Sequence, residues 1–431
     1  MSENRESQAT AFHPSQEFLA RAKRMDDAMH LRKPDRVPVA PLCIHFYATR
    51  IRGISNRDAM YHQERWFQAL KEETLLYNWD AAPPVGPVQP ARPLEILGLT
   101  QFKWPGGGLD DDQPFQWVEG EYMRQDEYDE MLANPNGFAV KKLWPRVSST
   151  LAPLAGMAQI PAPPLIALSN AYVLPAFLGG MITQSPLRDV MRRVLDLADE
   201  FEKNMGMAIG YAMEMMNLGY PIEWAACTFP PFDWISDTLR GLKGSSMDMY
   251  RAPEKLLTTI DMFTPATIGG AMAWAEAAHN KGVAIFMHRG ADGFMSNKQF
   301  AKFYWPSFKA LLLGLVDAGL TPIPLFEGDY TSRLEFLKEL PPGKIVGHFD
   351  RVDRKQAKKL IGDVMCFWGN IPASLMIAGT PQQVKDDVKE LIDTFADNGG
   401  LIVDSFNGFP DESRPENVAA VTEAVMEYGV W

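Results

Sequence analysis

Polar residues with acid–base chemistry follow a series of short apolar runs along the chain. Glu327, His348 and Asp350 stand at or near the ends of two such runs, and His45, His288 and His348, three of the seven histidines, occupy run ends of this kind. A carboxyl group or an imidazole can donate or accept a proton at a reacting centre when its pKa lies near the working pH. We therefore predict Glu327, His348 and Asp350 as catalytic residues.

Each of these three residues also has a structural interpretation. Glu327 could cap a helix, because carboxylates are favoured at helix starts, and His348 could be a buried histidine of the core. Asp350 and Asp353 both precede an amphipathic segment that begins near residue 354, and Asp353 is the one we expect to be its N-cap. The sequence leaves the catalytic and structural roles of Glu327, His348 and Asp350 open.

Candidates for substrate binding lie in the loops that follow the same runs. His288 and Arg289 lead into a Gly-Ala-Asp-Gly turn, and two adjacent side chains that can carry positive charge favour an anionic ligand. Arg289 could instead pair with Asp292, and Asn407 with Gly408 could form only a turn. The predicted substrate-binding residues are His45, Tyr47, Phe229, His288, Arg289, Asn370, Asp404 and Asn407.

Short apolar runs alternate with amphipathic segments, and this alternation predicts the elements that hold these side chains. In a β/α barrel the carboxyl ends of parallel strands share one face, where the working residues lie. The expected fold class is α/β: a single (β/α)8 TIM barrel over residues 36–431, an N-terminal extension over 1–35 and an inserted lid-like segment around 96–145. Strands are expected at 36–42, 165–169, 222–227, 283–288, 321–327, 344–350, 366–371 and 401–406, and helices at 16–31, 57–77, 297–315, 330–340, 354–361 and 380–398.

Composition narrows the class of protein. The chain has 431 residues, 46% of them hydrophobic, which is enough to bury a large core. Its formal net charge of −12 disfavours binding to nucleic acid or to an anionic membrane surface. Three widely spaced cysteines form no CxxC site or disulfide framework, and no signal peptide or membrane span is visible. We expect a soluble, cytoplasmic protein.

The chain carries the motifs Arg36-Val-Pro-Val, the run at 344–350, Gly369-Asn370-Ile-Pro, Gly379-Thr380-Pro381 before a helix, Gly399-Gly400, and Arg414-Pro-Glu-Asn417 with Tyr428-Gly429. These motifs resemble those of a known group of proteins, the uroporphyrinogen decarboxylase superfamily. The resemblance covers the chain from about residue 20 to the C-terminus and is clearest over 283–431. The superfamily also contains methyltransferases that serve corrinoid proteins and coenzyme M.

Several positions depart from true uroporphyrinogen decarboxylases. Where that group has two arginines that bind the tetrapyrrole carboxylates after the first strand, this chain has Cys43 and Tyr47. The family's aspartate after the second strand falls near Gly86, and its late histidine becomes Asn407. An enzyme that binds a polycarboxylate needs its arginines, because bidentate guanidinium contacts provide much of such recognition. The departures therefore argue against the haem-pathway decarboxylation.

The zinc-dependent methyltransferases of the superfamily offer a second comparison. They carry His-x-Cys at the fifth strand end and a later cysteine, whereas the matching positions here are Leu325, Glu327 and Asn407. The usual thiolate ligands are therefore absent. A zinc site built from Glu327, His348 and Asp404 stays open, because carboxylate and imidazole also bind zinc.

The resemblance therefore implies a corrinoid-dependent methyltransferase. It would move a methyl group between a small methylated substrate, such as an aryl ether, amine or thioether, and a corrinoid (cobalamin). The chain has no DxHxxG cobalamin motif, so a partner corrinoid protein would supply the cofactor. One alternative is a cofactor-independent decarboxylase or lyase in which Arg289 holds a carboxylate, and another is a barrel that only binds ligand. Relatives often form homodimers, and a homodimer is expected on that ground alone.

Overall fold

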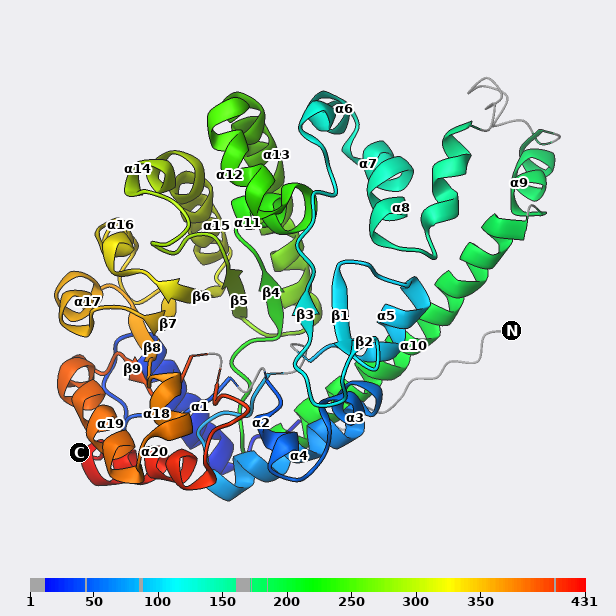
Figure 1. The fold of residues 1–431 in the computed structure, drawn as a ribbon. Helices are drawn as coiled ribbons and strands as arrows, with labels where there is room; N and C mark the ends of the chain where they lie inside the picture. The colour runs from blue at the N-terminus through cyan, green and yellow to red at the C-terminus, as the bar shows by residue number, and fades with distance from the viewer. Residues whose placement is uncertain are drawn as a thin grey trace.

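The protein is built around a six-stranded parallel sheet with strands in the order β4-β5-β6-β7-β8-β9. A computed structural model describes residues 12–42, 45–84, 88–159, 171, 173–183, 185–406 and 408–431. Figure 1 shows the six strands in one curved row with helices along its outer side. The strands are β4 (Ala226–Thr228), β5 (Gly282–Met287), β6 (Thr321–Asp329), β7 (Val346–Arg351), β8 (Cys366–Gly369) and β9 (Leu401–Ile402), and a separate small sheet contains β1 (Phe102–Pro105), β2 (Gly108–Leu109) and β3 (Gln116–Trp117).

Helices connect these strands and begin where local chemistry favours a helix start. Asp353 caps α17 as predicted, because its carboxylate accepts a hydrogen bond from the Gln356 amide at 2.8 Å. Thr380 and Gln383 form a capping box at the start of α19. The helix predicted over 57–77 is divided at His62. The α-helices are α1 (Gln16–Met29), α2 (Tyr47–Arg50), α3 (Asn56–Tyr61), α4 (Gln63–Tyr77), α5 (Ala91–Leu97), α6 (Tyr128–Ala133), α7 (Pro135–Phe138), α8 (Trp144–Val147), α9 (Val173–Thr183), α10 (Ser185–Asn217), α11 (Pro231–Ile235), α12 (Gly241–Arg251), α13 (Pro253–Ala277), α14 (Asn297–Gln299), α15 (Trp305–Asp317), α16 (Leu334–Leu337), α17 (Arg354–Ile361), α18 (Ala373–Ala378), α19 (Pro381–Phe395) and α20 (Pro415–Tyr428).

Two extended segments continue the row of strands beyond β9. Val39 forms a parallel bridge with Val403, and the Asp80 amide donates to the Val39 carbonyl at 2.8 Å. On the far side, the Ala82 amide donates to the carbonyl of Pro221, just upstream of β4, at 2.8 Å. The predicted strand at 36–42 is therefore in the row, and the next place in the row belongs to the segment around Asp80. The strand predicted at 165–169 lies outside the described residues.

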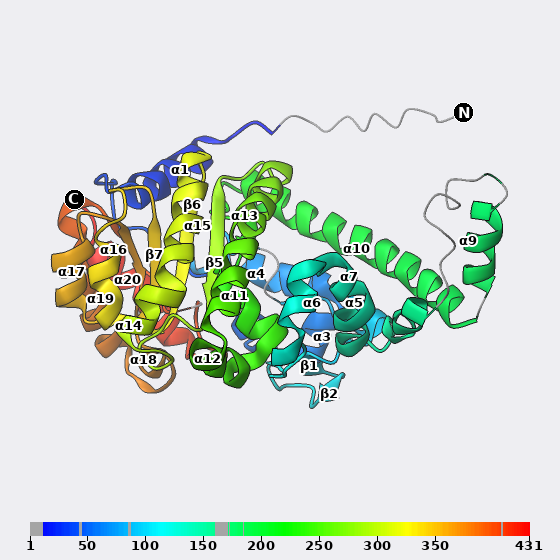
Figure 2. The ribbon, with the colours of Figure 1, turned by 90° about the horizontal axis from the view of Figure 1, so that it is seen from above.

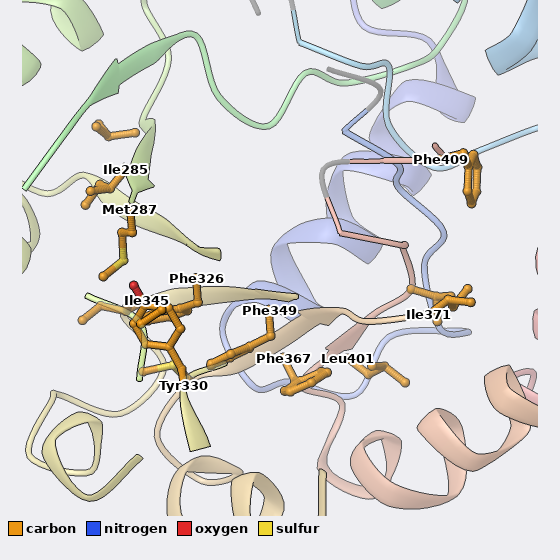
Figure 3. Close-up of a cluster of buried hydrophobic side chains, with 14 of the residues drawn as sticks. Ile285, Met287, Phe326, Tyr330, Ile345, Phe349, Phe367, Ile371, Leu401 and Phe409 are labelled. Atoms are coloured by element: carbon orange, nitrogen blue, oxygen red, sulfur yellow. The ribbon is translucent and has the colours of Figure 1, made fainter. Parts of the chain in front are cut away.

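The strands bury apolar side chains on both faces, as expected for a parallel sheet covered by helices. Figure 3 shows one of these packed faces, with Ile285 and Met287 of β5, Phe326 of β6, Phe349 of β7, Phe367 of β8 and Leu401 of β9. Phe349 lies at its centre, stacked on Phe326 at 4.6 Å and on Phe367 at 5.0 Å between ring centroids. The opposite face carries a second cluster, because side chains alternate along each strand. That second cluster includes Ala40, Leu42, Ala81, Trp224, Ala284, Ile323, Leu325, Val346, Cys366, Trp368 and Ile402.

This alternation places the predicted site residues on the second face. Glu327 lies two residues after Leu325, and His348 lies two residues after Val346, so each shares a face of the sheet with a residue of the second cluster. The register aligns Met287 with Phe326, so the residues that follow them, His288 and Glu327, emerge side by side. The sheet therefore brings its polar strand ends to one edge, as the sequence predicted.

The N-terminal helix α1 is tied to the sheet through a buried carboxylate. Asp80 is fully buried and accepts hydrogen bonds from Arg24 at 2.6 Å, from two nitrogens of Arg36 at 2.7 Å, and from the Val39 amide at 2.8 Å. A buried charge needs such partners to offset its lost hydration. Residues of the predicted extension thus form part of the folded body.

The small sheet β1–β3 and helices α5 to α8 lie to one side of the main sheet, in the chain region that the sequence marked as an insertion (Figure 1). Beside this region the long helix α10 extends away from the sheet, and α9 lies at its outer, N-terminal end (Figure 2). No helix among the described residues is long and apolar enough to cross a membrane.

Candidate functional site

A pair of aspartates on the helix after β4 organises the polar edge of the sheet. Pro230 and Pro231 end the extended segment and start α11, and proline is well suited to the first helical turn. Asp233 and Asp237 follow four residues apart, so they lie on one face of the helical segment. That face is turned toward the end of β5, because both carboxylates form hydrogen bonds with His288, the residue that follows the strand.

Asp233 fixes the backbone of the loop that follows β5. Its carboxylate accepts hydrogen bonds from the His288 amide at 2.9 Å, the Arg289 amide at 3.1 Å and the Tyr304 hydroxyl at 2.7 Å. Complete burial raises the pKa of Asp233 to about 7, and the nearby Asp237 charge adds to the increase. Asp233 therefore holds both cationic residues of the site in position through their main chain.

Asp237 holds the His288 imidazole. The Asp237 Oδ2 atom lies 2.5 Å from Nδ1 of His288, and the other ring nitrogen, Nε2, lies 3.8 Å from Oε2 of Glu327. Burial alone would lower the pKa of His288, but the Asp237 hydrogen bond and the charges of Asp237, Asp233 and Glu327 raise it to about 9. His288 is therefore a cation at neutral pH, and 34% of its side chain is exposed, so a substrate can reach it.

Glu327 completes the histidine cluster from the end of β6. Its side chain is 51% exposed. Partial burial raises the pKa of Glu327, the neighbouring His288 charge opposes this increase, and Asp350 adds to it. Burial also raises the pKa of Asp350, whose carboxylate accepts a hydrogen bond from the Gly328 amide at 3.1 Å. Glu327 thus lies where it can contact a bound substrate and the His288 ring together.

Arg289 is already surrounded by carboxylates. Its Nη2 atom forms an ion pair with Glu119, which lies in the region between β3 and α6, and a second with Asp237 at 3.1 Å. Its Nε atom donates to the Ser236 hydroxyl at 3.0 Å, and the guanidinium lies over the Phe294 ring at 5.4 Å. The alternative pairing with Asp292 is not formed, because that carboxylate faces Ser332.

His348 and Asp404 form a second, separate pair. Both side chains are fully buried, and Nε2 of His348 lies 3.1 Å from Oδ2 of Asp404. The same oxygen accepts a hydrogen bond from the Leu42 amide at 3.1 Å, and burial raises the pKa of Asp404, opposed by the contact with His348. The His348 ring packs against Trp368 and Phe406. This environment agrees with the interpretation of His348 as a buried histidine of the core. A catalytic role of His348 stays a prediction.

The other predicted substrate-binding residues lie in different surroundings. Phe229 packs against His288, with 5.5 Å between ring centroids, and so borders the histidine cluster. Tyr47 is buried against Phe409. His45 lies near Asp411, and its pKa is lowered by burial, although the charge of that aspartate opposes the decrease.

Asn370 and Asn407 complete the predicted set. Asn370 accepts a hydrogen bond from Arg354 at 3.0 Å and donates to the Asp350 carbonyl at 3.1 Å, so its amide is occupied within the fold. Asn370 and Asp350 border a surface cavity of about 710 Å³ with Arg354 and neighbouring residues. Asn407 lies outside the described residues.

The three candidate zinc ligands divide between two clusters. Glu327 lies beside His288, whereas His348 and Asp404 pair with each other. Within the described parts of the chain, no three histidine, cysteine, aspartate or glutamate side chains gather closely enough to hold a metal ion. The side chains of the described residues therefore do not form a set of ligands that fits zinc.

Sequence reasoning missed three carboxylates of this site. Asp233 and Asp237 carried a usable signal, because two acids four residues apart directly follow a strand end. Glu119 carried none, since its partner Arg289 is 170 residues away and belongs to a different part of the fold.

Fold and site together define a parallel α/β protein with an acid–base cluster at the carboxyl ends of its strands. A family model for uroporphyrinogen decarboxylase (URO-D) matches residues 208–428, more than half of the chain. The chain belongs to the URO-D family, which confirms the resemblance read from its motifs.

Individual relatives are distant. The uroporphyrinogen decarboxylase of Pseudoalteromonas translucida (strain TAC 125) is 24% identical over 182 residues, which cover 42% of this chain and 50% of that protein. The uroporphyrinogen decarboxylase of Alcanivorax borkumensis is 24% identical over 208 residues, covering 47% and 56%. The chain spans about half the length of the curated relatives it matches.

A solved structure extends the likeness in fold to nearly the whole chain. A methyltransferase from Methanosarcina mazei superposes with a TM-score of 0.60 and covers 95% of this chain and 98% of its own, at 16% sequence identity. At this identity the likeness concerns the fold alone.

Proposed function

We propose that this protein is a methyltransferase that moves a methyl group from a small methylated substrate to a corrinoid. The observation that carries the proposal is the Asp237–His288–Glu327 cluster, in which a protonated imidazole is clamped at the strand ends with Nε2 directed toward the half-exposed Glu327. A likeness in fold to a methyltransferase also supports it. Such a cluster can supply the proton that a departing oxygen, nitrogen or sulfur atom requires.

The bond changes balance with a single proton transfer. The bond between the methyl carbon and its heteroatom breaks, and the electron pair stays on the heteroatom. A reduced corrinoid, when bound, would supply the nucleophile to which the methyl group passes. His288 delivers its proton from Nε2 to the leaving atom, Asp237 holds the ring through Nδ1, and Glu327 lies where it can orient the substrate or return a proton to His288.

A corrinoid protein is the partner that this proposal requires. The chain has no cobalamin-binding motif of its own, so the cofactor would be presented by a separate protein at the strand ends. We also propose that the row of strands closes into an eight-stranded barrel, with the segments around Val39 and Asp80 between β9 and β4. The hydrogen bonds from both segments to their neighbours support this closure. A homodimer stays a prediction from family likeness.

Decarboxylation of a small carboxylated substrate is the second candidate. Membership in a family named for a decarboxylase favours it. Against it, the Nη2 atom of Arg289, the residue expected to hold the carboxylate, already faces Glu119 and Asp237. In this cluster the carboxyl groups of Glu119, Asp233, Asp237 and Glu327 outnumber the cations His288 and Arg289, and such surroundings repel an anionic substrate.

A pair of assays on the full chain tests the two candidates. Reduced cobalamin is mixed with the protein and a panel of methoxyaromatic, methylamine and methyl thioether compounds, and methylation is followed by the absorbance of the corrinoid. Substitution of His288→Gln should slow the transfer by roughly a hundredfold or more, the usual contribution of a general acid. The control His62→Gln alters an exposed histidine beside Glu64 and should leave the rate unchanged.

Two outcomes would contradict the proposal. Carbon dioxide release from a carboxylated compound in the absence of a corrinoid, without methyl transfer from any donor, would favour the decarboxylase. An unchanged transfer rate in the His288→Gln variant would remove His288 from the reaction.

A further inference from the structure

Glu119 reaches the site from the inserted region, through a segment that we call the strap, residues 116–123. One carboxylate oxygen of Glu119, Oε1, pairs with Nη2 of Arg289, and the other, Oε2, accepts a hydrogen bond from the Leu242 amide at 3.0 Å. The Arg289 side chain is only 12% exposed, whereas Glu119 is 48% exposed. Glu119 therefore covers Arg289 from the solvent side.

The strap is anchored by contacts that do not involve Arg289. The Met123 amide donates to the Leu239 carbonyl at 2.7 Å, and Glu121 forms an ion pair with Arg240. The backbone of the strap also passes very close to α12, since a Cβ atom on Gly241 would lie 2.8 Å from the Gly120 carbonyl oxygen. Glu119 is thus delivered to its position by the fold of the insertion and does not depend on its own ion pair.

The arrangement around Arg289 imitates a bound carboxylate. A guanidinium recognises a carboxylate through charge-assisted N–H donors, and here Nη2 faces carboxylate oxygens of Glu119 and Asp237 while Nε donates to Ser236. A substrate carboxylate would have to displace Glu119. It would also approach the carboxylates of Asp237 and Glu327, with no further positive charge to offset their repulsion.

We propose that Glu119 is a specificity-determining residue: it occupies the carboxylate-binding edge of Arg289, so that the site rejects anionic substrates and accepts neutral methylated compounds. This inference rests on the proposed function for the identity of the reaction. The placement of Phe229 beside His288 adds an apolar wall suited to such compounds. Removal of Glu119 would leave the ion pair of Arg289 with Asp237 in place and would open the solvent side of the guanidinium to a substrate carboxylate.

Binding of benzoate and of its uncharged analogue benzamide tests the inference without any turnover. Both affinities are measured by titration calorimetry on the full chain and on its Glu119→Gln and Glu119→Ala variants. The matched control is Asp126→Asn, because Asp126 follows the strap in the inserted region, its side chain is 80% exposed, and it faces Arg124, an arginine outside the cluster. A freed arginine should strengthen benzoate binding by about tenfold or more, the effect of one charge-assisted contact.

The predicted pattern is selective for charge. Benzoate should bind about tenfold tighter to both Glu119 variants, benzamide should change less than about twofold in every variant, and Asp126→Asn should behave as the unaltered protein. The inference is overturned if neither Glu119 variant gains affinity for benzoate, or if benzamide gains as much as benzoate. Loss of methyl transfer in the separate corrinoid assay would refute the proposed function and leave the binding result intact.

Discussion

The Asp237→Asn substitution tests the electrostatic basis of the site. In the unaltered protein, burial would lower the pKa of His288, and the hydrogen bond and charge of Asp237 are the largest effects that raise it to about 9. The amide of asparagine removes the negative charge and weakens the hydrogen bond. Burial of the ring, which lowers the pKa, is then opposed by fewer negative charges. We therefore expect the pKa of His288 to fall below its ordinary value of about 6.5.

The magnitude follows from the size of the shift. The pKa of His288 is raised from about 6.5 to about 9. Each unit of this increase corresponds to roughly 1.4 kcal/mol of favourable interaction between the charged ring and its surroundings. Because a third of the side chain is exposed, solvent screens part of this, and we expect the substitution to lower the free energy of unfolding at pH 6 by about 1–2 kcal/mol. The sign is set by the raised pKa: the stabilisation is complete below pH 6.5 and is lost as the pH rises through about 9.

Two measurements check this prediction. The pKa of His288 is read from the ring signals of ¹³C-labelled histidine, assigned with the His288→Gln variant, and the free energy of unfolding is measured by urea denaturation between pH 6 and 10. The control Asp292→Asn removes a nearby carboxylate that faces Ser332 and should leave the His288 titration unchanged. A His288 pKa at or below 7 in the unaltered protein, or an equal pKa in the Asp237→Asn variant, would refute the reasoning.

Three further substitutions test the packing that positions the site. Asp80→Asn removes a fully buried negative charge that pairs with Arg24 and Arg36, and it should lower the free energy of unfolding in urea by about 3 kcal/mol or more. A decrease below about 1 kcal/mol would contradict the role of Asp80 in holding α1 against the sheet. Phe349→Ala removes a ring stacked between two others and should lower the free energy of unfolding by about 3–5 kcal/mol, whereas a loss under 1 kcal/mol would mean that the core collapses around it. Gly241→Ala places a Cβ atom at φ +67° and 2.8 Å from the Gly120 carbonyl, so limited proteolysis should cleave the strap faster; unchanged cleavage would contradict its close packing.

The arrangement of the sheet was largely predictable from the sequence. Apolar runs of strand length recur between amphipathic segments, and each predicted run from 222–227 onward overlaps an observed strand. The short segment around Asp80, which the structure places beside Val39, is too brief for periodicity alone to mark it as a strand. The carboxyl ends predicted to carry the chemistry do meet at one edge.

The site itself was predictable only in part. Periodicity and strand ends located Glu327, His288 and His348, because these residues depend on local pattern and on the common direction of parallel strands. Their partners follow from tertiary structure: His288 pairs with Asp237 and Glu327, whereas His348 turns to Asp404. Charge on Arg289 suggested an anionic ligand, yet the protein supplies that anion itself from a distant insertion, which no local pattern indicates.

The pH dependence of methyl transfer tests the role of His288 most directly. With reduced cobalamin and an active methyl donor from the panel, we expect kcat/KM, which reports the pKa of the free protein, to stay constant through neutral pH and to fall as the pH rises through about 9, where the His288 imidazolium loses its proton. The fall should move below pH 6.5 in the Asp237→Asn variant. A rate that stays level through pH 10, or an identical profile in the two proteins, would contradict proton donation by His288.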